Sequence, residues 1–168
     1  FTTAPYPTRN FHHNLGDLKA QIAANEKGAQ ELRKMVGHFG LDVVLAYMKH
    51  VQDNAEESVR RVIENLSDGE FEYQMDFGAR IKVAITVHPE TRSATVDFTG
   101  TSPQQDNNFN ITHAVAVAAV LYTFRLMVDS DIPLNAGCLK PLNIIVPEDC
   151  MLRPKYPAAV VAGNVETS

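Results

Sequence analysis

The residues best suited to chemistry gather in three polar segments of the sequence, 97–104, 131–138 and 164–168. In the second segment a proline and a glycine shape the loop, so that Asn135 can present both an amide donor and an acceptor. An amide placed in this way can steady the oxyanion that forms when water attacks a carbonyl carbon. Asn135 is therefore a candidate catalytic residue.

The segment 164–168 follows a predicted buried strand, a place from which scaffolds commonly project polar groups into a cleft. Glu166 is the candidate general base, or the group that orients a water molecule. The predicted catalytic set is Asn135, Glu166 and Asp131. The candidate substrate-binding residues come from the first and third segments and are Asp97, Thr99, Ser102, Asn164 and Thr167.

The same residue types have a second interpretation, because Asx and Ser/Thr turns use them to satisfy neighbouring backbone groups. Cys138 is a weaker candidate, since no neighbouring base is identifiable and a small buried residue is its ordinary role. His113 suits a hydrogen-bonded core position, and His50 with Asn54 suits a solvated helix face. The sequence contains no phosphate-binding loop, zinc-binding His-Glu-x-x-His motif or nucleophile elbow, so no metal ligand is predicted.

The composition is that of an ordinary folded protein, with 45% hydrophobic and 21% charged residues among 168. Fifteen basic against 20 acidic residues give a net charge of −5, which argues against a nucleic-acid partner because such proteins need a basic surface. No apolar stretch reaches the length of a bilayer span, so no membrane partner is expected. Two cysteines cannot build a disulfide framework, and we expect a cytoplasmic protein with reduced thiols.

Hydrophobic periodicity predicts an α+β fold in three parts. Residues 1–13 form an arm or linker, 14–66 a long helical hairpin, and 67–168 an α+β part. Asn14 is the expected N-cap of the first helix, and Gly37 and Gly40 are expected to end it. The hairpin carries long apolar seams, which we expect to pack against the rest of a larger protein or another subunit, so an oligomer is expected.

Within 67–168 the apolar period changes to two, which predicts an antiparallel three-stranded meander along 71–77, 81–87 and 94–98. A helix that is hydrophobic on every side, and therefore buried, follows at about 110–128. Further short strands are predicted at 143–146 and 158–162. The first residue is Phe1 and the chain stops soon after the last predicted strand, so we expect a piece of a longer protein, truncated at both ends.

Three blocks of the sequence, in order along the chain, resemble the hydantoinase B/oxoprolinase family. They are 14–25, 96–102, and the run 132–138 continued by 154–160 and 163–168. The family includes N-methylhydantoinase B subunits, the carboxyl-terminal half of 5-oxoprolinases and the alpha subunits of acetone-type carboxylases. Three ordered blocks are more specific than a single short motif.

The resemblance implies part of a large ATP-dependent enzyme that opens a small cyclic amide, such as 5-oxoproline or a hydantoin. A hydantoinase A-type subunit or domain is the implied partner that phosphorylates the amide oxygen, after which the B-type part completes ring opening. ATP and a divalent metal are expected in the complete enzyme and no cofactor in this segment, which we expect to be inactive alone. The alternatives are a fragment of an acetone-type carboxylase alpha subunit and a non-catalytic scaffold or interaction module.

Overall fold

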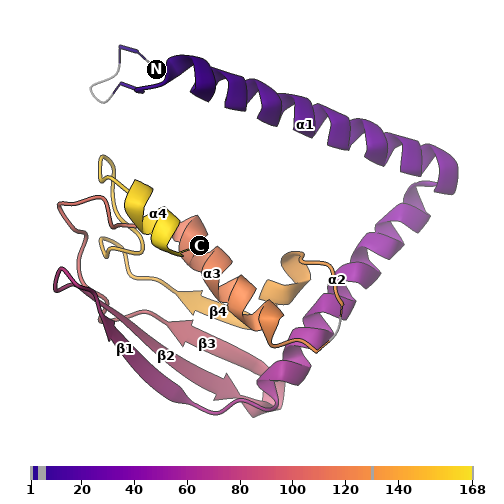
Figure 1. Ribbon diagram of the computed structural model, residues 1–168. Helices are drawn as coiled ribbons and strands as arrows, with labels where there is room; N and C mark the ends of the chain where they lie inside the picture. The colour runs from indigo at the N-terminus through magenta and orange to yellow at the C-terminus, as the bar shows by residue number, and fades with distance from the viewer. Residues whose placement is uncertain (1, 4–6, 130, 168) are drawn as a thin grey trace. The chain divides into compact units, whose positions relative to one another are not determined.

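The computed structural model describes residues 2–3, 7–129 and 131–167. The chain divides into two compact units, Phe1–Lys49 and His50–Ser168. The first unit holds helix α1 (Phe11–Phe39) and the beginning of helix α2 (Leu41–Ile63). The remaining elements belong to the second unit, which carries the sheet (Figure 1).

Both long helices predicted from the sequence are present, and α1 begins earlier than predicted. Its N-cap is Asn10, whose side chain accepts a hydrogen bond from the backbone N–H of His13 at 3.4 Å. Gly40 ends α1 as predicted, with φ of 84°, a left-handed conformation that glycine adopts readily. No residue of α1 is buried, and the antiparallel packing of the two helices stays a prediction. None of the helices in the described residues is long and apolar enough to cross a membrane.

The second unit contains a four-stranded mixed sheet, whose strands lie in the order β1-β2-β3-β4. The first three strands pair antiparallel, as their alternation predicts, whereas β4 pairs parallel with β3, with Ala94 opposite Leu142. The α+β class is confirmed, but the predicted three-stranded meander is part of this larger sheet. The strands are β1 (Gly69–Gln74), β2 (Arg80–His88), β3 (Ser93–Asp97) and β4 (Leu142–Ile145).

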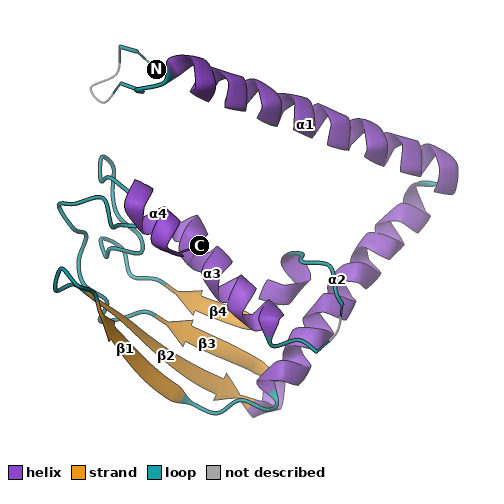
Figure 2. Cartoon of the chain, in the orientation of Figure 1, coloured by secondary structure: helices purple, strands orange, loops and turns teal. Residues whose placement is uncertain are grey.

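Helices α3 (His113–Leu126) and α4 (Val161–Thr167) lie over one face of the sheet (Figure 2). The predicted all-round burial of α3 is wrong for these residues, because only Ala116, Val120 and Phe124 are buried. The strand predicted at 158–162 is also wrong, since α4 begins at Val161. A short apolar run does not by itself distinguish a strand from a helix.

Two apolar clusters make the core of the second unit. The first joins the carboxyl-terminal half of α2 to the sheet and α3, through residues such as Val59, Val96 and Phe124. The second cluster lies around Ala116 and Met151. The described residues also include two short 3-10 helices, η1 (Pro89–Thr91) between β2 and β3, and η2 (Ala136–Leu139) before β4.

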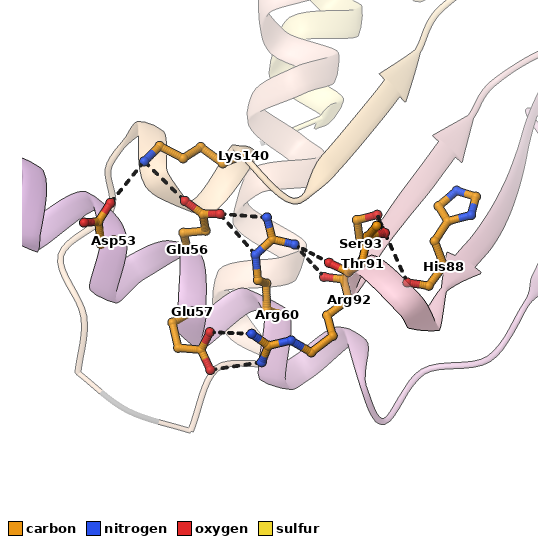
Figure 3. A network of polar contacts seen from close by, with 9 residues as sticks. All are labelled: Asp53, Glu56, Glu57, Arg60, His88, Thr91, Arg92, Ser93 and Lys140. Atoms are coloured by element: carbon orange, nitrogen blue, oxygen red, sulfur yellow. Dashed lines mark hydrogen bonds and ion pairs between the residues drawn. The ribbon is translucent and has the colours of Figure 1, made fainter.

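An ion-pair network fixes α2 to the turn between β2 and β3 (Figure 3). Arg92 donates two hydrogen bonds to the carboxylate of Glu57, at 3.0 and 2.9 Å, and a third to Glu64 at 2.9 Å. Arg60 binds Glu56 at 2.7 Å and also donates to backbone oxygens of the turn, at 2.6 and 3.1 Å. Arg92 of the turn binds Glu57 of α2, and Arg60 of α2 binds the backbone of the turn, so the network holds this helix against the adjoining ends of β2 and β3.

We expect the ion pair between Glu57 and Arg92 to stabilise the fold at neutral pH and to stop doing so in acid. Glu57→Gln should abolish this pH-dependent contribution. The Arg92 guanidinium lowers the pKa of Glu57, and Arg60 does the same for the pKa of Glu56. A carboxyl with a lowered folded-state pKa stabilises the fold above its unfolded value, near 4.5, and this stabilisation is lost as pH falls through the folded pKa. We expect Glu57→Gln to lower the thermal unfolding midpoint at pH 7, and the difference from wild type to shrink below pH 4.5.

Thermal unfolding at neutral, mildly acidic and strongly acidic pH measures this difference. Glu148→Gln is the matched control, because the side chains of Glu148 and Arg153 are both exposed where they pair at 3.3 Å, and exposed pairs contribute little. A Glu57→Gln effect of the same size at every pH would show that the carboxylate charge does not produce it.

Candidate functional site

A cavity of about 410 Å³ lies between the sheet and the helices over it. Tyr73 of β1 and Ile81 of β2 line one side, and Ala116 of α3 lines the other. Glu166 and Thr167 of α4 also belong to the lining. The volume lies in the range of sites for small molecules, and such sites are typically mostly apolar with a few polar groups.

The polar groups that reach this cavity come mainly from α4. Glu166 is the only carboxylate among the described lining residues, so it is the group there that can take a proton from water. The Thr167 hydroxyl donates to the carbonyl oxygen of Gly163 at 2.7 Å, which leaves its oxygen able to accept a further hydrogen bond. Two of the predicted site residues therefore lie together at one cavity.

Asn110, just before α3, is a fully buried polar residue that sequence reasoning missed. Its side-chain oxygen accepts the backbone N–H of Gln105 at 2.8 Å. Its amide nitrogen donates to the carbonyl oxygens of Gln105, Asn107 and Ala159, each at 3.0 Å. Asn110 therefore ties the loop before α3 to the segment that leads into α4. Nothing in the local sequence distinguishes it from the neighbouring asparagines, which are exposed.

The structure places Asn135 and Asp131 beyond the opposite end of α3. Asn135 caps η2: its side-chain oxygen accepts the N–H of Gly137 at 2.8 Å, and its nitrogen donates to the carbonyl oxygen of Pro133 at 3.0 Å. Asp131 is exposed and lies 3.7 Å from Arg125, near the last turn of α3. The cavity instead adjoins the first half of α3, a helix of 14 residues and thus about 20 Å long. Asn135 and Asp131 are therefore separated from Glu166.

The segment after β3 places a hydrophobic residue, Phe98, in the cavity lining. Its polar neighbours bind backbone groups: Asp97 accepts the N–H of Thr99 at 2.8 Å within the turn, and Ser102 accepts the N–H of Arg80, at the start of β2, at 2.9 Å. The last candidate, Asn164, has its side-chain oxygen 3.4 Å from the backbone nitrogen of Thr112. The Asp97 contact corresponds to the turn interpretation, whereas Ser102 and Asn164 bind backbone groups that are distant in the sequence. The binding of substrate by these residues stays a prediction.

The family model described as hydantoinase B/oxoprolinase matches residues 2–168. The chain belongs to the hydantoinase B/oxoprolinase family. One relative, 5-oxoprolinase 1 from Arabidopsis thaliana, is 42% identical over 99% of this chain. A second, 5-oxoprolinase from Saccharomyces cerevisiae, is 42% identical over 96% of it. This hydantoinase B-type chain spans 14% and 13% of the lengths of these two relatives.

A solved structure has the same fold as this member of the hydantoinase B/oxoprolinase family. It is the ATP-dependent caprolactamase from Pseudomonas jessenii, with a TM-score of 0.67 over 94% of this chain and 30% of that chain. The sequence identity is 20%, so the comparison concerns the fold alone.

The other reactive side chains of the described residues are the cysteines and the residue types that can bind metals. Cys138 and Cys150 are free thiols and both are buried. Among the described residues, no group of three or more His, Cys, Asp or Glu side chains is arranged to hold a metal ion. The divalent metal expected in the complete enzyme therefore has no ligand set of this kind in the described part of the hydantoinase B-type chain.

Asn135→Ala separates a structural role from a catalytic one. The amide caps η2 and bridges a loop, so its removal is expected to cost about 1 kcal/mol of unfolding free energy, as for other capping side chains. Urea unfolding of the intact protein measures the structural role, and kcat measures the catalytic one. Asn135→Asp is the control, since it keeps the oxygen that accepts the N–H of Gly137. A 100-fold fall in kcat with unchanged stability would instead support the oxyanion role predicted from the sequence.

Proposed function

We propose that the complete protein hydrolyses a small cyclic amide in an ATP-dependent reaction, with 5-oxoproline or a hydantoin as substrate. The observation that carries this proposal is the 42% identity to 5-oxoprolinase 1 of Arabidopsis thaliana over 99% of this chain. Because the chain spans 14% of that relative, the activity is proposed for the complete protein rather than for these residues alone.

The reaction needs one part that phosphorylates the amide and a second part that completes ring opening, and this chain belongs to the second part. An amide carbonyl is a poor target for water, whereas phosphorylation of its oxygen gives an activated carbon with a phosphate leaving group. A hydantoinase A-type subunit or domain is the proposed partner that binds ATP with its divalent cation and phosphorylates the substrate. The hydantoinase B-type part then completes ring opening.

The cavity between the sheet and the helices is the proposed place for the ring. Its apolar walls exclude bulk water and hold the ring in one orientation, which favours attack by a single positioned water. Glu166 takes a proton from that water as its oxygen bonds to the activated carbon. The ring C–N bond of this adduct then breaks, and the nitrogen leaves with the proton returned by Glu166. A second water hydrolyses the resulting acyl phosphate, so that phosphate departs with its bonding electrons and a carboxylate remains. The Thr167 hydroxyl oxygen accepts a hydrogen bond at the same edge of the ring.

Assays of the intact protein together with its A-type partner test the proposal. We expect ring opening and ADP formation with 5-oxoproline or hydantoin in the presence of ATP and Mg²⁺. Reactions without ATP, and reactions of the 168-residue chain alone, should show no turnover. Carboxylation of acetone with bicarbonate, without turnover of any cyclic amide, would replace the proposal with the carboxylase alternative. No ATP-dependent turnover of either substrate class would favour a non-catalytic scaffold.

A further inference from the structure

We propose that Gly163 is a positioning residue, which sets the place of the Glu166 carboxylate by letting α4 lie directly against the backbone of Asn110. The catalytic part of this inference rests on the proposed function. The structural part, that Gly163 allows α4 to pack closely against the backbone of Asn110 (the seat of α4), does not rest on the proposed function.

The seat of α4 is a close approach between two backbones. A Cβ atom added at Gly163 would lie 2.3 Å from the carbonyl oxygen of Asn110, far inside the distance that real carbon and oxygen atoms keep. The N–H of Gly163 donates to the carbonyl oxygen of Asn108 at 3.0 Å. Gly163 is buried, so the contact has no solvent side into which a larger residue can move. Only glycine permits α4 to approach this closely.

The surface under Gly163 is itself held firmly. The Asn110 side chain is fully buried and bonded to four backbone groups at 2.8 to 3.0 Å. The backbone of Asn110 therefore cannot withdraw easily when a methyl group is added at Gly163. Any adjustment to a larger residue must come from α4.

A displacement of α4 reaches the carboxylate through a single helical turn. Glu166 and Thr167 follow Gly163 by three and four positions, so all three lie on one face of the helix. The same three residues line the cavity. The hydrogen bond from the Thr167 hydroxyl to the Gly163 carbonyl oxygen, at 2.7 Å, closes this turn.

The Glu166 carboxylate depends on this seat, because its own contacts do not fix it. Among the described residues it forms no hydrogen bond or ion pair. Its position is therefore set by the helix that carries it. The placement of a general base matters strongly, since a misplacement of about 1 Å can cost about 100-fold in rate.

Gly163→Ala in the intact protein tests the seat and its catalytic role separately. We expect hydrogen exchange in the segments 108–112 and 161–167 to become about tenfold faster. We also expect kcat to fall by about 10-fold to 100-fold with KM little changed, because ring binding uses the apolar walls. The acidic limb of the pH profile of kcat, which reports the base, should move as the surroundings of Glu166 change.

Gly28→Ala is the matched control, because a Cβ at Gly28 in α1 has no atom within 4 Å and should leave exchange, kcat and pH profile unchanged. Asn164→Ala is a second variant in case Gly163→Ala does not fold. It removes only the contact with Thr112, and smaller changes in the same directions are expected.

The outcomes separate the two parts of the inference. Unchanged exchange in 161–167 would overturn the seat. Faster exchange with wild-type kcat and pH profile would overturn the positioning role. If the wild-type protein opens no cyclic amide, the proposed function fails, and the exchange measurement still decides whether Gly163 seats α4.

Discussion

Glu166→Gln in the intact enzyme is expected to lower kcat by about 100-fold or more, which is the typical contribution of a positioned general base. Glutamine has nearly the shape of glutamate but cannot accept a proton from water. The side chain lines the cavity and is exposed on a short helix, so the unfolding midpoint and KM should stay close to the wild-type values. The loss is therefore expected in the chemical step alone.

Steady-state kinetics with 5-oxoproline or hydantoin, together with thermal unfolding, measure this effect. Glu148→Gln is the control, since Glu148 is exposed in a loop and does not line the cavity. Wild-type kcat in Glu166→Gln would remove this carboxylate from the mechanism and leave α4 a structural role only.

Asn110→Ala is expected to lower the unfolding free energy by more than about 3 kcal/mol, because each buried polar group left without a partner costs about 1–3 kcal/mol. The substitution deprives one N–H and three carbonyl oxygens of their partner. It also opens a cavity where the fully buried side chain was. Few other polar substitutions in this chain should have so large an effect.

Urea unfolding of the intact protein measures this loss of unfolding free energy. The dependence of the unfolding free energy on urea concentration is compared between the variants. Asn143→Ala is the control, because Asn143 is exposed and makes one long contact with Thr95, at 3.5 Å. A change there of more than about 0.5 kcal/mol is not expected. An equal effect of both substitutions would show that the buried network does not stabilise the fold.

Local patterns in the sequence predict most of the elements of this fold. The alternation of Phe71 and Tyr73 with acidic residues predicts β1, and the runs after it predict β2 and β3 in their antiparallel order. Both long helices follow from their apolar seams. These elements are predictable because each depends on residues that are close in the sequence.

Features that depend on distant contacts were not predictable in the same way. The run 143–146 indicates a strand, but nothing local shows that it pairs parallel with β3. The apolar run 158–162 fits a strand by composition, yet α4 begins at Val161 where Gly163 meets the backbone of Asn110. The burial of Asn110 is invisible in a hydropathy pattern for the same reason.

The candidate site shows the same division. Glu166 and Thr167 are neighbours in the sequence, and the structure places both at one cavity. The expectation that Asn135 lies with them depended on how the chain returns after α3, and residue types carry no information about that path. Asn135 is instead held beside α2, where its amide nitrogen lies 3.5 Å from the carbonyl oxygen of Val51.

The parallel pairing of β3 with β4 has a consequence for the order in which a growing polypeptide acquires its shape. Strand β3 leaves the ribosome well before Leu142, its partner residue in β4, so one edge of β3 stays unpaired while the intervening residues are synthesised. Unpaired strand edges can associate with other chains. Chaperones bind incompletely folded chains that expose such edges. The cavity closes later still, because its lining includes residues of α4. A nascent chain from which β4 has emerged and α4 has not therefore carries a sheet that still lacks the wall bearing the carboxylate.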